Sequence, residues 1–168
     1  HLSMRVVMHI DFDSFYASLE ENRKSELNGK PIVICMFSGR TEDSGAVATA
    51  NYQAREKGEK AGIPITQAKS LAPDAIFLQA DLEYYRSVSD EIMDMLRGFA
   101  ASFEQRSIDE AYIDISSKSF EEAAELAERI KKDVKENFGI TCSIGIAPNK
   151  LIAKMASRHK KPDGLTVV

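Results

Sequence analysis

Ser107–Ile115 reads Ser-Ile-Asp-Glu-Ala-Tyr-Ile-Asp-Ile and places two adjacent carboxylates, Asp109 and Glu110, among apolar residues of high β-propensity. Neighbouring residues of a regular strand point to opposite faces, so one of these carboxylates would enter the core if the strand continued. A buried, unpaired carboxylate is too costly for that arrangement. We therefore predict a tight hairpin with arms Phe103–Ile108 and Ala111–Ile115 and with both carboxylates at its tip.

Two like charges at such a tip repel each other, by roughly 4 kcal/mol at about 4 Å if the effective dielectric constant is near 20. A divalent cation is the usual means of offsetting this repulsion. The sequence thus indicates a candidate metal site at the hairpin. The alternative is that Asp109 and Glu110 are solvated turn residues.

A second pair of carboxylates follows Val6–Ile10, which is predicted to be a buried strand. Asp11 falls at the end of this strand and is the candidate metal ligand. Asp13 is placed to cap the N-terminus of a helix that begins near Ser14, and we predict a structural role for it. Acidic residues at strand ends from distant parts of the chain suggest an oxygen-rich Mg²⁺ or Mn²⁺ site.

Composition limits the class of protein. The chain has 168 residues, of which 43% are hydrophobic and 29% are charged, and no apolar run approaches the roughly 18 residues of a membrane span. We expect a cytoplasmic globular protein that does not interact with membranes. Cys35 and Cys142 lie in apolar strand-like runs and are predicted to be reduced core residues, with a disulfide as the weaker alternative. The net charge of −4 argues against tight DNA binding by this chain alone.

The hydrophobic periodicity predicts an α+β fold with alternating strands and helices around the carboxylate hairpin. The predicted helices are Ser14–Asn22, Ala50–Glu56, Pro64–Leu71, Leu82–Phe99, Phe120–Phe138 and Asn149–Ser157. Besides the hairpin, the predicted strands are Val6–Ile10, Pro31–Phe37, Ala46–Ala48, Ile76–Leu78, Ile140–Ala147 and Leu165–Val168.

Five motifs in order resemble those of the Y-family, or translesion, DNA polymerases, most closely the DNA polymerase IV branch. The motifs are Asp11–Glu20 (DFDSFYASLE), Ser38–Arg40 with Gly45–Arg55 (GAVATANYQAR), Ser107–Asp114, Asn149-Lys150, and Lys161–Gly164 (KPDG). The resemblance covers the chain from Met4 to Val168. It implies a polymerase palm built on a ferredoxin-like mixed or antiparallel sheet with helices, plus a small α/β fingers insert. The implied domains are residues 4–37 for the first part of the palm, 38–79 for the fingers and 80–168 for the second part of the palm, with the thumb and the C-terminal DNA-binding domain absent.

The resemblance implies a low-fidelity DNA polymerase that transfers a nucleotide from dNTP to a primer 3′-OH under the direction of a template. Its catalytic metal ligands would be Asp11, Asp109 and Glu110, joined by the backbone carbonyl of Phe12. The implied cofactors are two Mg²⁺ ions, for which Mn²⁺ can substitute. This chain alone is expected to be weakly active or inactive.

Further residues are expected to bind the nucleotide. The spacing of Thr49, Tyr52 and Arg55 places them on one face of a predicted helix, and a hydroxyl, a phenol and a guanidinium there would suit a triphosphate. Without the resemblance, a solvated helix face is the simpler interpretation. Lys161 is the other implied triphosphate contact, although Arg158–Lys161 could equally be a solvated run of charge.

The resemblance also implies the shape of the nucleotide pocket. Tyr16 would be the steric gate that excludes a ribose 2′-hydroxyl, while Phe15 belongs to the core. Ala46 and Ala48 would leave the pocket for the nascent base pair loose. Tyr112 would support the hairpin and the sugar of the incoming nucleotide.

The expected partners are primer–template DNA, dNTP and a sliding clamp bound through the missing C-terminal region. A palm-like nucleotide cyclase is the alternative enzyme, but the bulky side chain of Tyr16 argues against ribonucleotide substrates. A non-catalytic nucleic-acid-binding or protein-binding module is the alternative from another class. The intact carboxylates Asp11, Asp109 and Glu110 argue against it.

Overall fold

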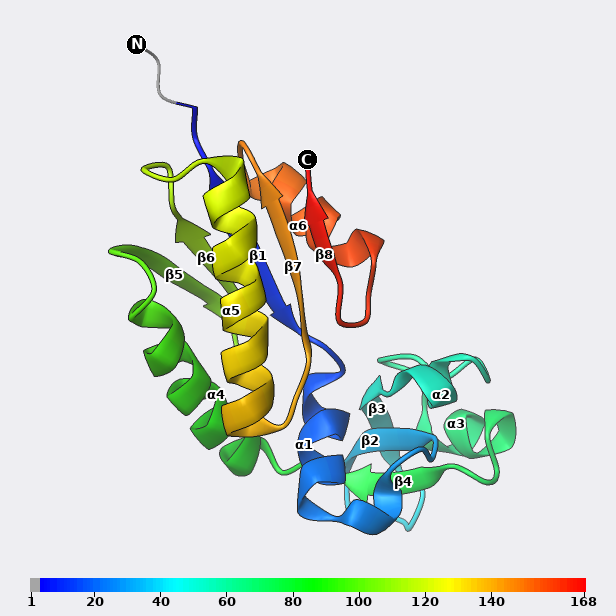
Figure 1. The fold of residues 1–168 in the computed structure, drawn as a ribbon. Helices are drawn as coiled ribbons and strands as arrows, with labels where there is room; N and C mark the ends of the chain where they lie inside the picture. The colour runs from blue at the N-terminus through cyan, green and yellow to red at the C-terminus, as the bar shows by residue number, and fades with distance from the viewer. Residues whose placement is uncertain (1–3) are drawn as a thin grey trace. The chain divides into compact units, whose positions relative to one another are not determined.

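The structure is a computed structural model that describes residues 4–168. The chain divides into two compact units (Figure 1). Residues 4–13 and Arg86–Val168 form the first, which we call the carboxylate unit because it contains the hairpin. Ser14–Tyr85 forms the second, which we call the insert unit.

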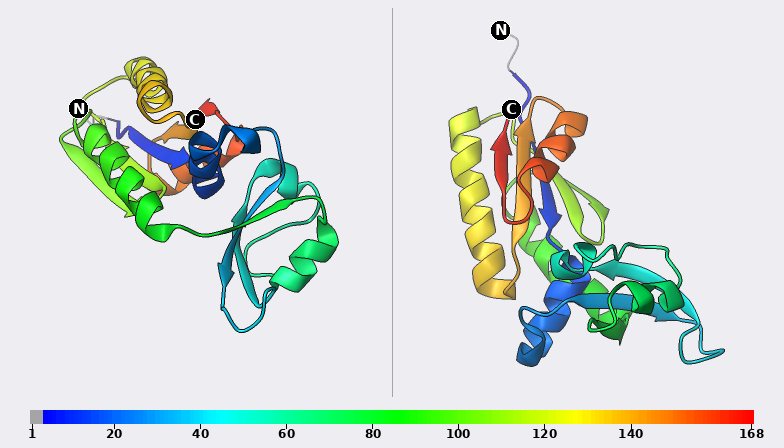
Figure 2. Two further views of the ribbon diagram at one scale, coloured as in Figure 1. Left: turned by 90° about the horizontal axis from the view of Figure 1, so that it is seen from below. Right: turned by 90° about the vertical axis from the view of Figure 1, so that its right-hand side faces the viewer.

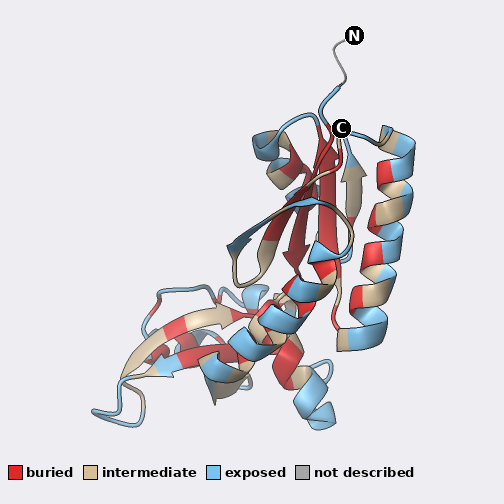
Figure 3. Cartoon of the chain, turned by 90° about the vertical axis from the view of Figure 1, so that its left-hand side faces the viewer, coloured by how far each residue is buried: buried red, intermediate tan, exposed pale blue. Residues whose placement is uncertain are grey.

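A mixed five-stranded sheet is the framework of the carboxylate unit. Its strand order is β5 (Ser102–Ser107), β6 (Glu110–Asp114), β1 (Val7–Phe12), β7 (Cys142–Ala147) and β8 (Leu165–Val167). The central strand β1 is antiparallel to both neighbours, and β8 is parallel to β7. Helices α5 (Phe120–Phe138) and α6 (Lys150–His159) cover opposite faces of this sheet (Figure 2). Every residue of β1 is consequently buried, including its two polar residues, as the red strands of Figure 3 illustrate.

Local signals explain the limits of the two covering helices. A capping box formed by Ser119 and Glu122 begins α5, and Gly139 ends it with a left-handed backbone (φ 71°). The side chain of Asn149 caps α6 by accepting a hydrogen bond from the N–H of Ile152. The predicted range Phe120–Phe138 is therefore confirmed.

Gly145 allows β7 and α6 to approach each other closely. A Cβ atom on this residue would lie 2.1 Å from the carbonyl oxygen of Ala153 and 2.4 Å from the nitrogen of Ser157. No side chain fits in that space. The close approach brings the polar residues of α6 onto the central strands.

The remaining helix of the carboxylate unit, α4 (Leu82–Arg97), starts at the end of the insert unit. It is amphipathic, and Ile92, Met93 and Leu96 are fully buried. Ser89 on the same helix donates a 2.5 Å hydrogen bond to the carbonyl oxygen of Ile108 in the hairpin turn. The helix thereby supports the turn that bears the two carboxylates.

The insert unit contains its own three-stranded sheet in the order β3 (Gly45–Ala50), β2 (Ile32–Phe37) and β4 (Ile76–Gln79). Strand β2 is antiparallel to β3 and parallel to β4. Its helical elements are α1 (Phe15–Arg23), η1 (Ser25–Leu27), α2 (Tyr52–Arg55) and α3 (Ile65–Leu71). Strand β2 and helix α1 belong to this unit, so the unit extends beyond the predicted fingers range 38–79 at both ends.

The predicted cap of α1 is wrong. Ser14 precedes the helix in a left-handed conformation (φ 40°), and no side chain caps the helix. Asp13 is buried and instead accepts hydrogen bonds from the hydroxyls of Thr141 (2.7 Å) and Ser143 (2.8 Å) and from the N–H of Asp163 (2.8 Å). Asp13 thus has a structural role, as expected. It does not cap α1, however, but connects the end of β1 to β7 and to the loop before β8.

The predicted helix Ala50–Glu56 is shorter than expected. Asn51 keeps an extended backbone because its N–H donates to the carbonyl oxygen of Ile32 and its side chain caps α2. Thr49 is therefore a strand residue, and the prediction that it shares a helix face with Tyr52 is wrong.

Both cysteines are free and buried, so the expected reduced state is confirmed. Burial raises the pKa of Cys35 to about 11 and that of Cys142 to about 12. Among residues 4–168, no helix is both long enough and apolar enough to cross a bilayer.

Candidate active site

The predicted hairpin is confirmed, but only Asp109 lies in its turn, whereas Glu110 belongs to the second strand. Strands β5 and β6 are antiparallel, and Ile108 and Asp109 form the turn between them. Glu110 is the first residue of β6 and lies opposite Asp11 on β1. Directly opposed residues of antiparallel strands have neighbouring side chains on one face of the sheet. The N–H of Phe12 donates a 2.9 Å hydrogen bond to the carbonyl oxygen of Asp109, which holds the turn against the end of β1.

Asp11 is almost buried, with 8% of its surface exposed. Its Oδ2 atom accepts a 2.6 Å hydrogen bond from the ammonium group of Lys161. Burial, together with the charges of Asp109 and Glu110, raises the pKa of Asp11 to about 6 against the opposing effect of Lys161. The carboxylate thus depends on a nearby positive charge for its ionised form.

Ser107 links the other two carboxylates. Its hydroxyl lies 2.9 Å from Oδ1 of Asp109 and 3.2 Å from Oε2 of Glu110. Burial raises the pKa of Asp109, and the charge of Glu110 adds to the increase. A buried carboxylate next to a like charge is a feature of functional sites.

Glu110 behaves differently from its neighbours. Burial alone would raise its pKa, but hydrogen bonds from His9 and from Lys154 outweigh burial and lower it. Its Oε1 atom lies 2.9 Å from Nε2 of His9 and 3.1 Å from Nζ of Lys154. Glu110 is therefore the one acid of the three whose pKa is lowered from its ordinary value.

Two lysines offset part of the repulsion among the three carboxylates, which, from the sequence, a divalent cation was expected to offset. Lys161 pairs with Asp11, and Lys154 pairs with Glu110. In the part of the chain that the structure describes, no three His, Cys, Asp or Glu side chains converge as a metal site. The donor set nevertheless fits Mg²⁺ or Mn²⁺, because carboxylate oxygens are the ligands these cations prefer.

The insert unit gathers the three residues predicted to bind a triphosphate. The guanidinium group of Arg55 lies 3.4 Å from the hydroxyl of Thr49 and 5.1 Å from the ring centroid of Tyr52. Thr49 comes from β3, whereas the other two residues come from α2. Their proximity thus arises from the turn at Asn51, not from helical spacing. Ala46 and Ala48 lie on the same strand as Thr49 and are partly buried.

Tyr16 stacks on Tyr85, with ring centroids 4.4 Å apart and planes inclined by 19°. The hydroxyl of Tyr85 donates a 2.6 Å hydrogen bond to Oε2 of Glu20, which is also paired with Arg23. Arg23 in turn pairs with Asp81 at 3.0 Å. The ring of Tyr16 therefore stacks on a tyrosine whose hydroxyl is held by a series of polar contacts within the insert unit.

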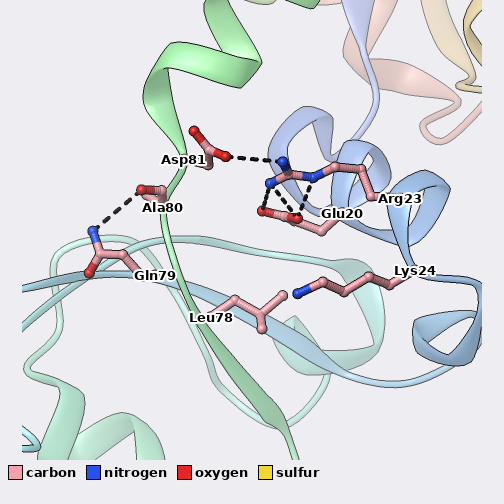
Figure 4. Close-up of a pocket in the computed structure, with 7 residues that line it drawn as sticks. All are labelled: Glu20, Arg23, Lys24, Leu78, Gln79, Ala80 and Asp81. Atoms are coloured by element: carbon pink, nitrogen blue, oxygen red, sulfur yellow. Dashed lines mark hydrogen bonds and ion pairs between the residues drawn. The ribbon is translucent and has the colours of Figure 1, made fainter.

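A pocket of about 380 Å³ lies beside the polar contacts of Glu20, Arg23 and Asp81 (Figure 4). Its lining residues are Glu20, Arg23, Lys24, Leu78, Gln79, Ala80 and Asp81. Two acids balance two bases, and none of the predicted site residues lines it. We therefore assign no ligand to this pocket.

Three contact residues of the site escaped the sequence analysis. His9 precedes Asp11 by two residues and so shares its face of β1, which is a signal that could have indicated it. Lys154 and Ser157 have no such signal, because α6 is placed by packing alone. Tyr112 was predicted to support the hairpin, and its ring lies 4.8 Å from that of His9.

Comparisons with known proteins agree with this geometry. Residues 10–158 match the model of the impB/mucB/samB family. The chain is 53% identical to DNA polymerase IV of Methanosarcina acetivorans and 49% identical to DNA polymerase IV of Nitrosopumilus maritimus, in each case over 99% of this chain and 48% of the relative. It thus spans about half the length of these relatives.

Solved structures that resemble this chain are also DNA polymerases or related proteins of the same fold. DinB from Sulfolobus solfataricus matches with a TM-score of 0.93 and 43% identity, and the insertion ternary complex of Dbh DNA polymerase matches with a TM-score of 0.92 and 46% identity. Both matches cover 97% of this chain and 48% of the solved chain. The chain belongs to the impB/mucB/samB family, and its fold is that of the Y-family DNA polymerases.

Proposed function

We propose that this chain is the catalytic part of a low-fidelity, template-directed DNA polymerase that adds a nucleotide from dNTP to a primer 3′-OH. In this proposal residues 4–37 and 80–168 form the palm, and residues 38–79 form the fingers. The remainder of the polymerase would lie in the half of the relatives' length that this chain does not match. Primer–template DNA, dNTP and, through that other half, a sliding clamp would be its partners in the cytoplasm.

The observation that supports this proposal most directly is the pairing of Asp11 with Glu110 on adjacent central strands, next to Asp109 in the turn. Three acids gathered at one end of a sheet are unfavourable without positive charge. We propose that Asp11, Asp109, Glu110 and the backbone carbonyl of Phe12 hold two divalent cations. When bound, such cations activate the primer hydroxyl and stabilise the pyrophosphate leaving group.

The chain's own residues would bind and orient the nucleotide. Lys161 would exchange its contact with Asp11 for the triphosphate, since an ammonium group suits either anion. Thr49, Tyr52 and Arg55 are also proposed as triphosphate contacts, because their hydroxyl, phenol and guanidinium groups lie close together in the insert unit. Tyr16 would exclude ribonucleotides by contact with the sugar, and Ala46 and Ala48 would leave room for distorted base pairs.

Primer extension by the longer protein tests this proposal. We expect Mg²⁺-dependent or Mn²⁺-dependent addition of dNTP on an abasic template, and a loss of more than about 100-fold in Glu110→Gln. Glu104→Gln is the matched control, because Glu104 is an exposed acid on the same sheet that pairs with Lys150. Full activity in Glu110→Gln, or formation of a cyclic nucleotide from NTP without DNA, would contradict the proposal.

A further inference from the structure

His9 is a buried polar residue in the middle of the carboxylate unit. None of its surface is exposed to solvent. Its Nε2 atom lies 2.9 Å from Oε1 of Glu110, and its Nδ1 atom lies 2.7 Å from the hydroxyl of Ser157. One side of the ring faces Tyr112. Each nitrogen has a partner, and the ring is confined by neighbours on β6 and α6.

The contact with Glu110 determines that Nε2 of His9 bears a proton. An ionised carboxylate can only accept, so Nε2 is the atom that donates to Glu110. On the opposite side of the ring, Nδ1 lies 2.7 Å from the hydroxyl of Ser157, which itself donates a 2.7 Å hydrogen bond to the carbonyl oxygen of Lys154. Ser157 thus holds the far side of the ring in place while Nε2 faces Glu110, as outer partners commonly do for histidines in active sites.

His9 also determines which oxygen of Glu110 faces the other acids. Oε1 is occupied by His9 and Lys154, whereas Oε2 is directed to Ser107 and, through it, to Asp109. Lys154 is a flexible side chain with 29% of its surface exposed. The ring of His9 has no comparable freedom, so it is the more rigid of the two donors.

We infer that His9 is a positioning residue that fixes the carboxylate of Glu110 so that Oε2 is presented to a divalent cation shared with Asp109. This inference rests on the proposed function. A glutamate has three side-chain torsions and loses entropy when it is ordered. Because the hydrogen bond from His9 orders Glu110 before the cation arrives, its loss should weaken cation binding about 10- to 100-fold.

Two amide variants separate positioning from simple core packing. The amide nitrogen of His9→Gln can occupy the place of Nε2 and donate to Glu110, whereas that of His9→Asn corresponds to Nδ1 and is too short. Both variants place an amide in the same buried space, so they share the cost of the substitution. Thermal unfolding measured by circular dichroism would show whether each variant is folded.

Binding of Mn²⁺ alone to this chain, followed by electron paramagnetic resonance of the free ion, is the principal measurement. We expect His9→Asn to weaken binding about 10-fold or more, His9→Gln to stay within about threefold of the wild type, and Ser157→Ala to fall between them. In the longer protein, kcat should fall in His9→Asn while KM for dNTP is unchanged, because the proposed triphosphate contacts are intact.

The outcomes distinguish this inference from the function on which it rests. If wild-type protein binds no Mn²⁺ through its carboxylates, the proposed function and this inference both fail. If the wild type binds Mn²⁺ and His9→Asn binds it equally well, only the positioning role is overturned. Equal losses in folded His9→Gln and His9→Asn would also overturn it, because the donor at Nε2 would then be irrelevant.

Discussion

Replacing Glu59 with leucine should stabilise the protein, although a charged residue is removed from a chain rich in charge. Glu59 lies between α2 and α3 with only 2% of its surface exposed. Within residues 4–168, neither of its carboxylate oxygens has a hydrogen-bond partner. Its own N–H donates to the carbonyl oxygen of Ala54, which belongs to the hydrophobic core of the insert unit.

The expected gain follows from this environment. A buried polar group without a partner costs about 1–3 kcal/mol, and a charged one costs more. Leucine is one atom shorter than glutamate and has no polar atoms, so Glu59→Leu should raise the free energy of unfolding by about 2–4 kcal/mol. For a chain of this size, that gain corresponds to an increase in Tm on the order of 10 °C. Glu59→Gln removes the charge but keeps unpaired polar atoms, so we expect only about 1 kcal/mol from it.

The stabilisation should depend on pH in a defined direction. Burial raises the pKa of Glu59 above its ordinary value of 4.5. The folded state therefore binds the proton more tightly than the unfolded state, and wild-type stability falls as pH rises from 4.5 through the raised pKa. The advantage of Glu59→Leu should be smallest near pH 4 and should reach its full value above the raised pKa.

Urea unfolding followed by circular dichroism is the suitable assay, since the chain contains no tryptophan. Glu56→Leu is the matched control, because Glu56 is an exposed glutamate three residues earlier. We expect that control to stay within about 0.5 kcal/mol of the wild type. If Glu59→Leu is no more stable than the wild type at pH 7, or if its advantage grows toward pH 4, the argument from an unpaired carboxylate is refuted.

Four other predictions concern the site and its surroundings. Asp109→Ala should abolish nucleotide addition by the longer protein while the Tm of this chain stays equal or rises slightly, because a like charge is removed; a lower Tm would count against the repulsion described here. Tyr16→Ala should admit ribonucleotides with little loss of dNTP use, as measured by the ratio of kcat/KM values, and an unchanged ratio would place discrimination elsewhere. Asp13→Ala should lower the free energy of unfolding by about 3 kcal/mol in urea, because a buried carboxylate loses three hydrogen bonds; a change below about 1 kcal/mol would contradict this account. Because its net charge is −4, this chain should bind duplex DNA with a Kd no better than about 10⁻⁵ M at physiological salt. A sub-micromolar Kd from fluorescence anisotropy with labelled duplex DNA would contradict this prediction.

The sequence by itself determined the elements whose signals are local. Helix α5 has the range that its periodicity predicts, and the structure shows why: the capping box at Ser119 begins it and Gly139 ends it, and both act within a few residues. The hairpin at Asp109 and Glu110 was predictable because period-two alternation cannot accommodate adjacent acids in a buried strand. The motifs also indicated the family, which the comparisons confirm.

Only the tertiary structure decided which groups meet. Lys161 reaches Asp11 across 150 positions of sequence, and His9 reaches Glu110 across 101. From the sequence, Asp13 was predicted to cap a helix, but it accepts hydrogen bonds from the hydroxyls of Thr141, just before β7, and Ser143, on β7. The reason is that a buried carboxylate must be hydrogen-bonded, and these donors are the ones that the fold places beside it. Local sequence signals cannot predict such contacts between distant residues. These contacts depend on the order of strands in the sheet and on the close approach of α6 to β7 that Gly145 allows.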